Sequence, residues 1–285
     1  NLHEIIYAKI CDEFRNLNSN HQLLHQLFWC LTNMCDTAKF ADFLFQKNII
    51  IRAIQFVSIH KNKGYVFVQP AITCISNAFR FCEYAQTLAC EVLQKNINNF
   101  FFAEMQFNVD TLWMIAYVTQ RGYHQIVTNT RFIIKNMLSQ EKISTPCIRI
   151  IANMATMNNS LVNDGVLQQI HNILTREEKE CQYVETFFAL ANIVCDFVDS
   201  KDDFNGIVLS HILDFAYLYA TKKKISKFED NVNDTAVEAG FCIVNAFHTK
   251  TKLHEELLER YKEVYTFVMK QTDRCWDQLK INILK

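Results

Sequence analysis

The stretch Phe28-Trp29-Cys30-Leu31-Thr32-Asn33 is an apolar run that ends in a side-chain amide. The same pattern returns five times along the 285 residues, at intervals of 36 to 53 residues, and Tyr replaces the amide once. The later runs are Ile72–Asn77, Leu112–Tyr117, Ile148–Asn153, Phe187–Asn192 and Gly240–Asn245. A period near forty residues with helical units is typical of solenoids in which each unit buries its apolar face against the next. The sequence therefore predicts an all-α solenoid of the armadillo or HEAT type.

The composition favours the same fold class. The chain has only 5 glycines and 2 prolines, so it has few residues for tight hairpins or phosphate-binding loops, and 50% of it is hydrophobic. Because each repeat of a solenoid contacts only its neighbours, we expect one continuous solenoid over residues 1–285 rather than separate domains. We expect about seven repeats, the first of them partial, with the C-terminal helices capping the stack.

The charge and the cysteines limit the choice of partner and compartment. The formal net charge is −1, which gives no overall attraction to nucleic acid, and no apolar stretch is long enough to cross a bilayer. The 11 cysteines are scattered through apolar runs without a C-x-x-C pair or a signal-like N-terminus. We therefore expect a protein of the cytoplasm and nucleus, with neither a membrane nor a nucleic acid as its partner.

Short polar stretches between the apolar runs predict the joints of the repeats. They are Lys47–Ile49, Lys95–Ile97, Thr128–Thr130, Asp164–Val166 and Asn205–Ile207. Asn and Gly tolerate the left-handed backbone that ends one helix and turns the chain into the next. The 53-residue interval before Asn245 contains a polar and charged segment at 222–234, which predicts an inserted loop. The alternative interpretation is a regulatory or self-binding basic segment.

A second position accompanies each amide, four residues earlier, where the two side chains share one face of a helix. Its occupants are Trp29, Thr73, Trp113, Arg149, Phe188 and Phe241. Three residues before it stands an acid in three of the repeats, namely Asp110, Glu185 and Glu238. An amide can bond the backbone of an extended peptide, an aromatic ring can hold the stem and charge of Lys or Arg, and an acid can pair with that charge. The triplet therefore predicts a surface that reads a basic peptide.

At these residues the chain resembles the importin-α (karyopherin-α) family of armadillo-repeat nuclear import adaptors, as a divergent member. That family carries a Trp-x-x-x-Asn array on its inner helices, with Tyr for Asn in the fourth repeat and Arg for Trp in the fifth. The pairs Trp113/Tyr117 and Arg149/Asn153 follow that order. The resemblance covers about residues 20–250 and implies an armadillo solenoid with a right-handed superhelical twist, without cofactor or metal.

The resemblance also implies two peptide-binding sites. The major-site-like residues are Trp29, Asn33, Asn77, Asp110, Trp113 and Tyr117. The minor-site-like residues are Arg149, Asn153, Glu185, Phe188, Asn192, Glu238, Phe241 and Asn245, with Arg149 separating the two sites. Four departures predict weaker or altered recognition of simple basic signals: Thr73 replaces an indole, Phe188 and Phe241 are poorer cation-binding faces than Trp, and Gln120 stands where the family usually has an acid after Tyr117.

Structural interpretations compete with this one at each position taken alone. A single Asn at a helix end is commonly a local hydrogen-bonding or capping residue, and Trp29, Trp113, Phe188 or Phe241 alone would be core residues. Five amides in register, with Tyr at the one exception, favour a shared row that faces a ligand. No nucleophile elbow, phosphate loop or pair of catalytic acids occurs, so we do not expect an enzyme.

Two hypotheses of function follow. The first is an importin-α-like adaptor that binds the basic, nuclear-localisation-type segment of a cargo protein in a concave groove for nuclear import. The second is a dedicated armadillo scaffold or chaperone for one protein partner, with little general import activity. The family's first repeat and its basic N-terminal segment for importin-β are not recognisable. A fragment of a longer adaptor would lack them, and so would a relative that works without importin-β.

Overall fold

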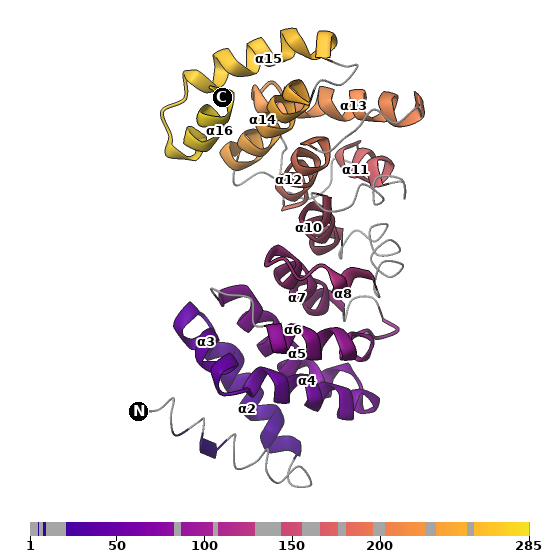
Figure 1. The fold of residues 1–285 in the computed structure, drawn as a ribbon, viewed down its shortest axis with the longest axis vertical. Coiled ribbons are helices and arrows are strands. Elements are labelled where there is room, and N and C mark those ends of the chain that lie inside the picture. Colours follow the sequence, from indigo (N-terminus) through magenta and orange to yellow (C-terminus); the bar gives the residue numbers. More distant parts are fainter. Residues whose placement is uncertain are drawn as a thin grey trace. The chain divides into compact units, whose positions relative to one another are not determined.

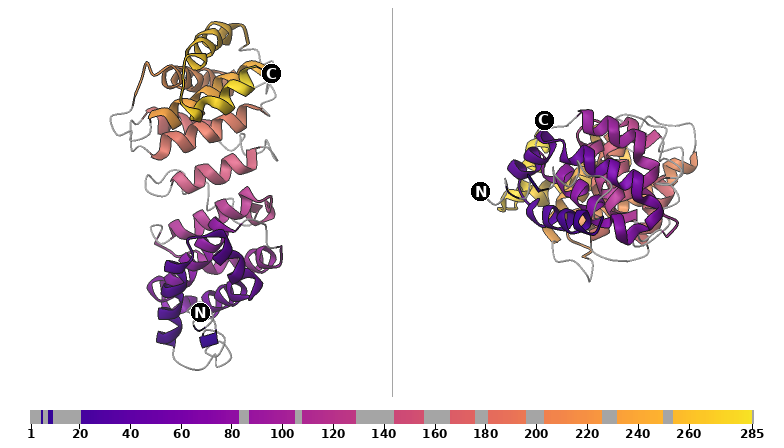
Figure 2. Two further views of the ribbon diagram at one scale, coloured as in Figure 1. Left: turned by 90° about the vertical axis from the view of Figure 1, so that its left-hand side faces the viewer. Right: turned by 90° about the horizontal axis from the view of Figure 1, so that it is seen from below.

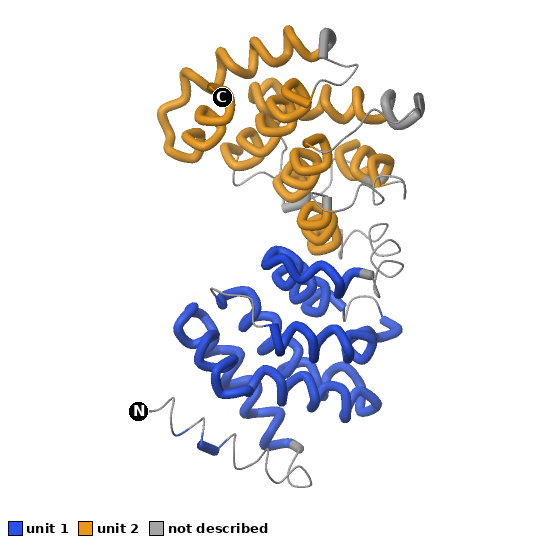
Figure 3. Tube along the Cα trace, viewed as in Figure 1, with its two compact units in different colours: residues 1–137 blue, residues 138–285 orange. Residues whose placement is uncertain are grey.

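The computed structural model describes residues 5, 8–9, 21–82, 87–104, 108–128, 144–155, 166–175, 181–195, 203–225, 232–249 and 254–284. Every regular element in these ranges is a helix. The chain forms two compact units, Asn1–Met137 and Leu138–Lys285, which are coloured separately in Figure 3. Each unit is an armadillo-type helical stack and is described by itself. The single continuous solenoid over residues 1–285 remains a prediction.

Unit 1 has two layers of helices. Its helices are α2 (His21–Met34), α3 (Ala38–Gln46), α4 (Ile49–His60), α5 (Tyr65–Phe81), α6 (Thr87–Asn96), α7 (Val109–Gln120) and α8 (Gln125–Thr128), with 3-10 turns η1 (Lys61–Lys63) and η2 (Ile97–Phe100). In one layer α5 packs against both α2 and α7, and in the other α4 packs against α6 (Figure 1). The helices that end in the repeated amide or its Tyr replacement therefore lie side by side.

Unit 2 repeats this arrangement. Its helices are α10 (Ser144–Ala155), α11 (Val166–Thr175), α12 (Cys181–Cys195), α13 (Asp203–Ala220), α14 (Val232–His248), α15 (His254–Met269) and α16 (Asp277–Ile283), with the 3-10 turn η5 (Arg274–Trp276). Helix α12 packs between α10 and α14, α11 packs against α13, and α15 and α16 pack against α14 (Figures 1 and 2). The amide-bearing helices again form one layer.

Local sequence explains how the first full repeat turns. Thr37 caps α3 by accepting a hydrogen bond from the Phe40 amide, as N-cap threonines do. Asn48 has φ = 58°, so the predicted left-handed joint between α3 and α4 is confirmed. Gly64 precedes α5 with φ = 91°, a conformation that side chains with a Cβ disfavour.

Of the other predicted joints, Lys95–Ile97 is confirmed in position but not in backbone conformation, and Asn205–Ile207 is wrong. Asn96 ends α6 with φ = −110° and instead donates from Nδ2 to the Val92 carbonyl, which satisfies the helix end without a left-handed residue. Asn205–Ile207 lies inside α13, because the helix begins at Asp203. Residues 129–130 and 164–165 lie outside the described residues.

The predicted insertion at 222–234 is described in part. Lys222 has φ = 54° and follows the end of α13, and α14 takes in the last three residues of the segment from Val232. Residues 226–231 lie outside the described residues.

The core of each unit is built from aliphatic and aromatic side chains between the layers. In unit 1, Phe28 meets Phe56 at 5.1 Å between ring centroids, and in unit 2 Phe187 meets Tyr219 at 5.4 Å. Trp276 on η5 is fully buried beneath α15, which joins the last helices to the stack. Within the described ranges no helix has the length and apolarity to span a membrane.

Candidate functional site

The repeated asparagines connect neighbouring helices through one recurring hydrogen bond. Asn77 Nδ2 donates to the Thr32 carbonyl at 3.4 Å, and Asn192 Nδ2 donates to the Ala152 carbonyl at 3.2 Å. Asn245 Nδ2 donates to the Ala191 carbonyl at 3.0 Å. In each case the acceptor is the residue immediately before the amide of the preceding repeat. The amides of neighbouring repeats are thereby in register, and they are half-buried rather than enclosed in the core.

An amide nitrogen carries two donors and the amide oxygen is an acceptor. The bond to the preceding carbonyl uses one donor, so the second donor and the oxygen stay available for a ligand. The structural and the ligand-binding interpretations of these asparagines are therefore compatible. Asn33, at the end of α2, is exposed.

In unit 1 the acid Asp110 is engaged by its own chain. Thr73 Oγ1 donates to Asp110 Oδ2 at 2.7 Å. Burial, followed by the charge of Asp110 and a hydrogen bond to it, raises the pKa of Tyr65 to about 12, so the phenol stays protonated and donates to that carboxylate. Thr73, at the position where Trp29 and Trp113 stand in the neighbouring repeats, thus binds the acid of the next repeat, Asp110.

In unit 2 the equivalent contact joins Arg149 to Glu185. Arg149 Nη2 donates to Glu185 Oε1 at 2.6 Å, and Arg149 Nε lies 2.5 Å from Glu185 Oε2. The same guanidinium lies 4.4 Å from the centroid of the Phe188 ring. The side chains are 26% and 14% exposed for Arg149 and Glu185, so the pair is partly screened from water. This arginine occupies the aromatic and acidic contacts that the sequence suggested for a ligand cation.

Glu238 differs from the other two acids. The corresponding position of the preceding repeat is Phe188, which has no hydrogen-bond donor, and no hydrogen bond to the Glu238 carboxylate occurs within the described part of the chain. Burial, opposed by Arg149 and reinforced by Glu185 and Asp234, raises the pKa of Glu238 to about 7. Glu185, Asp234 and Glu238 outnumber the single Arg149 at this end of the row. When Glu238 is ionised it can accept an added cation, because its carboxylate receives no hydrogen bond in the described part of the chain.

The aromatic members of the row are accessible. Trp29, Trp113 and Phe241 are half-buried, as is Tyr117. Trp113 and Tyr117 stack at 5.8 Å between centroids with 20° between their planes, so the Tyr that replaces Asn forms one aromatic surface with the indole. The structure describes all fourteen predicted site residues. It places the first six on α2, α5 and α7, and the other eight on α10, α12 and α14.

Two further arrangements lie outside the predicted row. Arg121 donates to the carbonyls of Tyr117, Arg80 and Cys82, and so joins the C-terminal ends of α7 and α5. The run Lys222–Lys224 is engaged within unit 2: Lys222 donates to Asn233 Oδ1 at 2.6 Å, and Lys223 pairs with Glu263 at 2.6 Å. Arg121 could have been recognised from sequence, because a positively charged residue is favourable at the C-terminal end of a helix. The partners of Arg121 and of the lysines are distant in sequence and could not have been predicted from it.

No protein-family model matches the chain, and no curated protein matches it. Among solved structures, the fold is similar to a designed armadillo-repeat protein in complex with the peptide (KR)4, with a TM-score of 0.55 and 16% identity over 82% of this chain and 97% of that one. It is also similar to computationally designed armadillo-repeat proteins for modular peptide recognition, with a TM-score of 0.59 and 17% identity over 81% and 98% of the two chains. The chain has an armadillo-repeat fold, and the importin-α resemblance remains a prediction.

Proposed function

We propose that this protein is an importin-α-like adaptor that binds an extended, basic segment of a cargo protein along its amide-bearing helices for nuclear import. The observation that carries the proposal is the recurring bond from Asn77, Asn192 and Asn245 to the preceding repeat. Within each unit it holds the amides in register beside half-buried aromatic rings and acids. An extended peptide offers backbone donors and acceptors that such amides can bind.

The similar designed protein in complex with the peptide (KR)4 supports the choice of a basic ligand. Alternating Lys and Arg side chains need acids and aromatic faces, and this chain offers both on α7, α12 and α14. Because Arg149 and Thr73 already engage two of the acids, the proposed ligand places its principal cation at Glu238, between Phe188 and Phe241. We therefore expect recognition to depend on fewer contacts to ligand cations than an array with Trp at every one of these positions would provide.

The test is binding of a fluorescent lysine-rich bipartite peptide, measured by anisotropy, to the wild type and to Asn192→Ala with Glu238→Ala. We expect the double variant to lose at least about tenfold in affinity, since each lost charged or bidentate contact contributes about 1 to 3 kcal/mol. A matched control is Asn282→Ala with Glu259→Ala, on α16 and α15 away from the row. Equal affinity in the row variant, or no binding to the wild type, contradicts the proposal.

A second candidate function is a dedicated scaffold for one protein partner. The observation that favours it is the self-engagement of Asp110 and Glu185 by Thr73 and Arg149, which reduces the capacity for general basic signals. Affinity purification from native extract separates the two functions. One stoichiometric partner without importin-β indicates the scaffold, whereas importin-β with many basic nuclear proteins indicates the adaptor.

A further inference from the structure

The repeat helices of unit 1 differ from those of unit 2 in the acids that they offer to a ligand. In the row, the acid position is the one three residues before Trp or its replacement. Gln26, Pro70 and Asp110 occupy it in α2, α5 and α7, so unit 1 has one acid at this position. In unit 2, by contrast, both α12 and α14 carry a glutamate there. The contacts of Asp110 therefore decide how the row of unit 1 treats a ligand cation.

Two side chains of α5 engage Asp110. Thr73 Oγ1 donates to Asp110 Oδ2 at 2.7 Å, which is shorter than its 3.1 Å contact with the Gln69 carbonyl. The phenol of Tyr65 donates a second hydrogen bond to the same carboxylate. The ring of Tyr65 is held by an edge contact with Phe102, at 5.3 Å between centroids. Donors that already bond a carboxylate use acceptor sites that a ligand ammonium would need, so Asp110 attracts an added cation less than a free acid does.

The aromatic surface beside Asp110 is formed by Trp113 and Tyr117. Both side chains are half-buried, and their ring planes are 20° apart at 5.8 Å between centroids. Asp110 precedes Trp113 by three residues and so shares its helix face. One turn after Tyr117, Arg121 donates to the Tyr117 carbonyl at 2.9 Å. Along α7, a cation on these rings would therefore have a hydrogen-bonded acid one turn before it and a guanidinium one turn after it.

An uncharged residue suits this surface better than a cation. Proline packs its ring on aromatic side chains and favours the extended backbone that the amides of the row are proposed to bind. Building on the proposed function, we propose that Tyr65 and Thr73 are specificity-determining residues. By engaging Asp110 they make the Trp113–Tyr117 surface bind a proline of the extended partner segment, where a free acid would select Lys or Arg. The partner segment therefore carries a proline in addition to the cation that pairs with Glu238.

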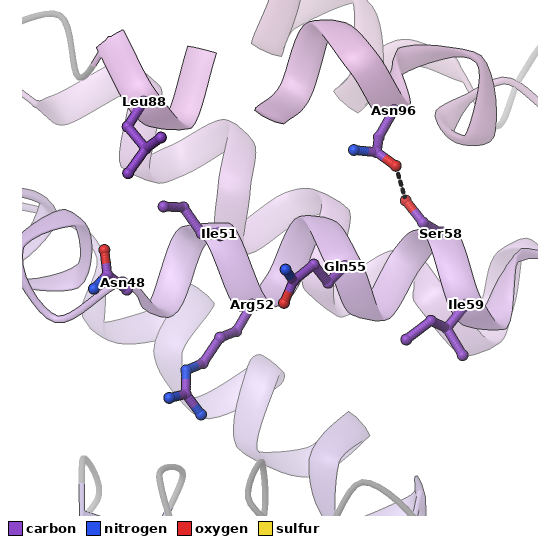
Figure 4. A pocket seen from close by; sticks show the side chains of 8 residues that line it. All are labelled: Asn48, Ile51, Arg52, Gln55, Ser58, Ile59, Leu88 and Asn96. Carbon is purple, nitrogen blue, oxygen red and sulfur yellow. Dashed lines mark hydrogen bonds between the residues drawn. The ribbon is translucent and has the colours of Figure 1, made fainter. Parts of the chain in front are cut away.

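A second apolar surface of unit 1 has to be distinguished from this one. A pocket of about 720 Å³ lies on α4 and α6, and Ile51, Ile59, Leu88 and Asn96 are among the residues that line it (Figure 4). Ile59 and Leu88 are 60% and 59% exposed, so an uncharged peptide has apolar contacts there as well. None of the residues that line the pocket belongs to α2, α5 or α7. A substitution in the pocket is therefore a suitable control.

Two labelled peptides of about ten residues test the preference, one alternating serine with proline and the other alternating serine with lysine. Both are measured by fluorescence anisotropy at about 0.15 M salt, which limits non-specific attraction of the lysines. The protein is the full chain with Asn192→Ala and Glu238→Ala, so that the proposed cation site of unit 2 is removed. We expect the proline peptide to bind at least about tenfold more tightly than the lysine peptide. Equal affinities, a preference for lysine or no binding of the proline peptide overturns the proposal.

Two substitutions in the same background locate the proline. Trp113→Ala removes half of the aromatic surface and should weaken binding of the proline peptide at least about tenfold. Leu88→Ala, in the pocket on α4 and α6, should leave this binding unchanged. The reverse result, in which Leu88→Ala weakens binding and Trp113→Ala does not, would place the peptide in the pocket and overturn the proposal.

Removing the two donors tests the role of Tyr65 and Thr73. Tyr65→Phe with Thr73→Val should shift the ratio of the two affinities at least about tenfold toward the lysine peptide, and adding Asp110→Asn should cancel the shift. A general loss of stability lowers both affinities together, so the ratio separates selectivity from folding. Tyr123→Phe with Thr266→Val is the matched control, because these hydroxyls bond groups outside the row. An unchanged ratio in the Tyr65 and Thr73 variant overturns the assigned role.

The result is separable from the test of the proposed function. The adaptor is contradicted if the wild type does not bind the lysine-rich bipartite peptide, or binds it without need of Asn192 and Glu238. The selectivity assigned to Tyr65 and Thr73 is contradicted by the two serine-containing peptides alone, whatever the bipartite peptide does.

Discussion

The guanidinium of Arg149 lies 4.4 Å from the centre of the Phe188 ring and donates a 2.6 Å hydrogen bond to Glu185. A cation, an aromatic face and a carboxylate therefore meet in one place, although no ligand takes part. The protein uses its own side chain for the kind of contact that the row is proposed to offer to a basic peptide. This occupancy separates Glu185, whose charge Arg149 neutralises, from Glu238, whose carboxylate receives no hydrogen bond in the described part of the chain.

Removing Arg149 should weaken the fold and open the site. We expect Arg149→Met to lower the free energy of unfolding by about 1 to 3 kcal/mol, because Glu185 loses its partner while partly buried. We also expect the lysine-rich peptide to bind more tightly, since Glu185 and Phe188 become available to it. Urea denaturation and fluorescence anisotropy measure the two effects. Arg149→Lys, which keeps the positive charge, is the control. Weaker peptide binding by Arg149→Met would contradict the interpretation that Arg149 occupies the contacts of a ligand cation.

Glu238 should make stability decrease as pH rises. Its folded pKa of about 7 lies above the ordinary pKa of a glutamate, 4.5, so between these pH values the folded state holds a proton that the unfolded state releases. Glu238→Gln lacks this effect. We expect the variant to gain about 2 to 3 kcal/mol relative to the wild type as pH rises from 4.5 to 8. The free energy of unfolding of both proteins is measured by urea titration at several pH values. A difference between wild type and Glu238→Gln that stays constant with pH would contradict a buried, protonated Glu238.

The same proton should control peptide binding. A ligand cation prefers ionised Glu238, so the affinity of the wild type for the lysine-rich peptide should increase from pH 6 to pH 8. Glu238→Gln should show a flat dependence over this range. A wild-type affinity that falls with rising pH, measured at constant ionic strength, would rule out Glu238 as the cation-binding acid.

The hydrogen bonds of the asparagines predict that replacing different asparagines of the row by Ala lowers the free energy of unfolding by different amounts. Asn245→Ala leaves the Ala191 carbonyl without its side-chain donor, and we expect a loss of about 1 to 2 kcal/mol in unfolding free energy. Asn33→Ala is the matched comparison, because Asn33 is exposed, and it should change stability by less than about 0.5 kcal/mol. Thermal and urea unfolding of both variants test the difference. Equal losses would mean that the bond of Asn245 does not stabilise the stack.

Thr73 should act through its hydroxyl. Thr73→Val removes one of the two donors to Asp110 and should cost about 1 kcal/mol, whereas Thr73→Ser retains the hydroxyl and should cost less. Because Asp110 then has more capacity to accept from a ligand, Thr73→Val should also raise the affinity of unit 1 for basic peptides. Identical stability of the Val and Ser variants in urea titrations would show that this hydrogen bond contributes nothing.

The sequence alone was sufficient for the fold class. The recurrence of an apolar run and an amide every forty residues or so predicts neighbouring helices with one repeated position, and α2, α5 and α7 meet this expectation in unit 1, as α10, α12 and α14 do in unit 2. Asn48 was also predictable, because a left-handed residue is a local requirement. Asn205–Ile207 was not, since favourable packing of α13 overrides the local preference for a turn.

The sequence by itself determined the type of each repeat and the helix face that carries its amide, aromatic residue and acid, because these depend on spacings of three and four residues within one helix. Only the tertiary structure decided which acids are already engaged by side chains of the protein itself. Thr73 meets Asp110, Arg149 meets Glu185, and Phe188 provides no donor for Glu238. The physical reason is that these contacts join side chains 36 to 50 residues apart, and their register is set by how neighbouring helices pack rather than by any local pattern.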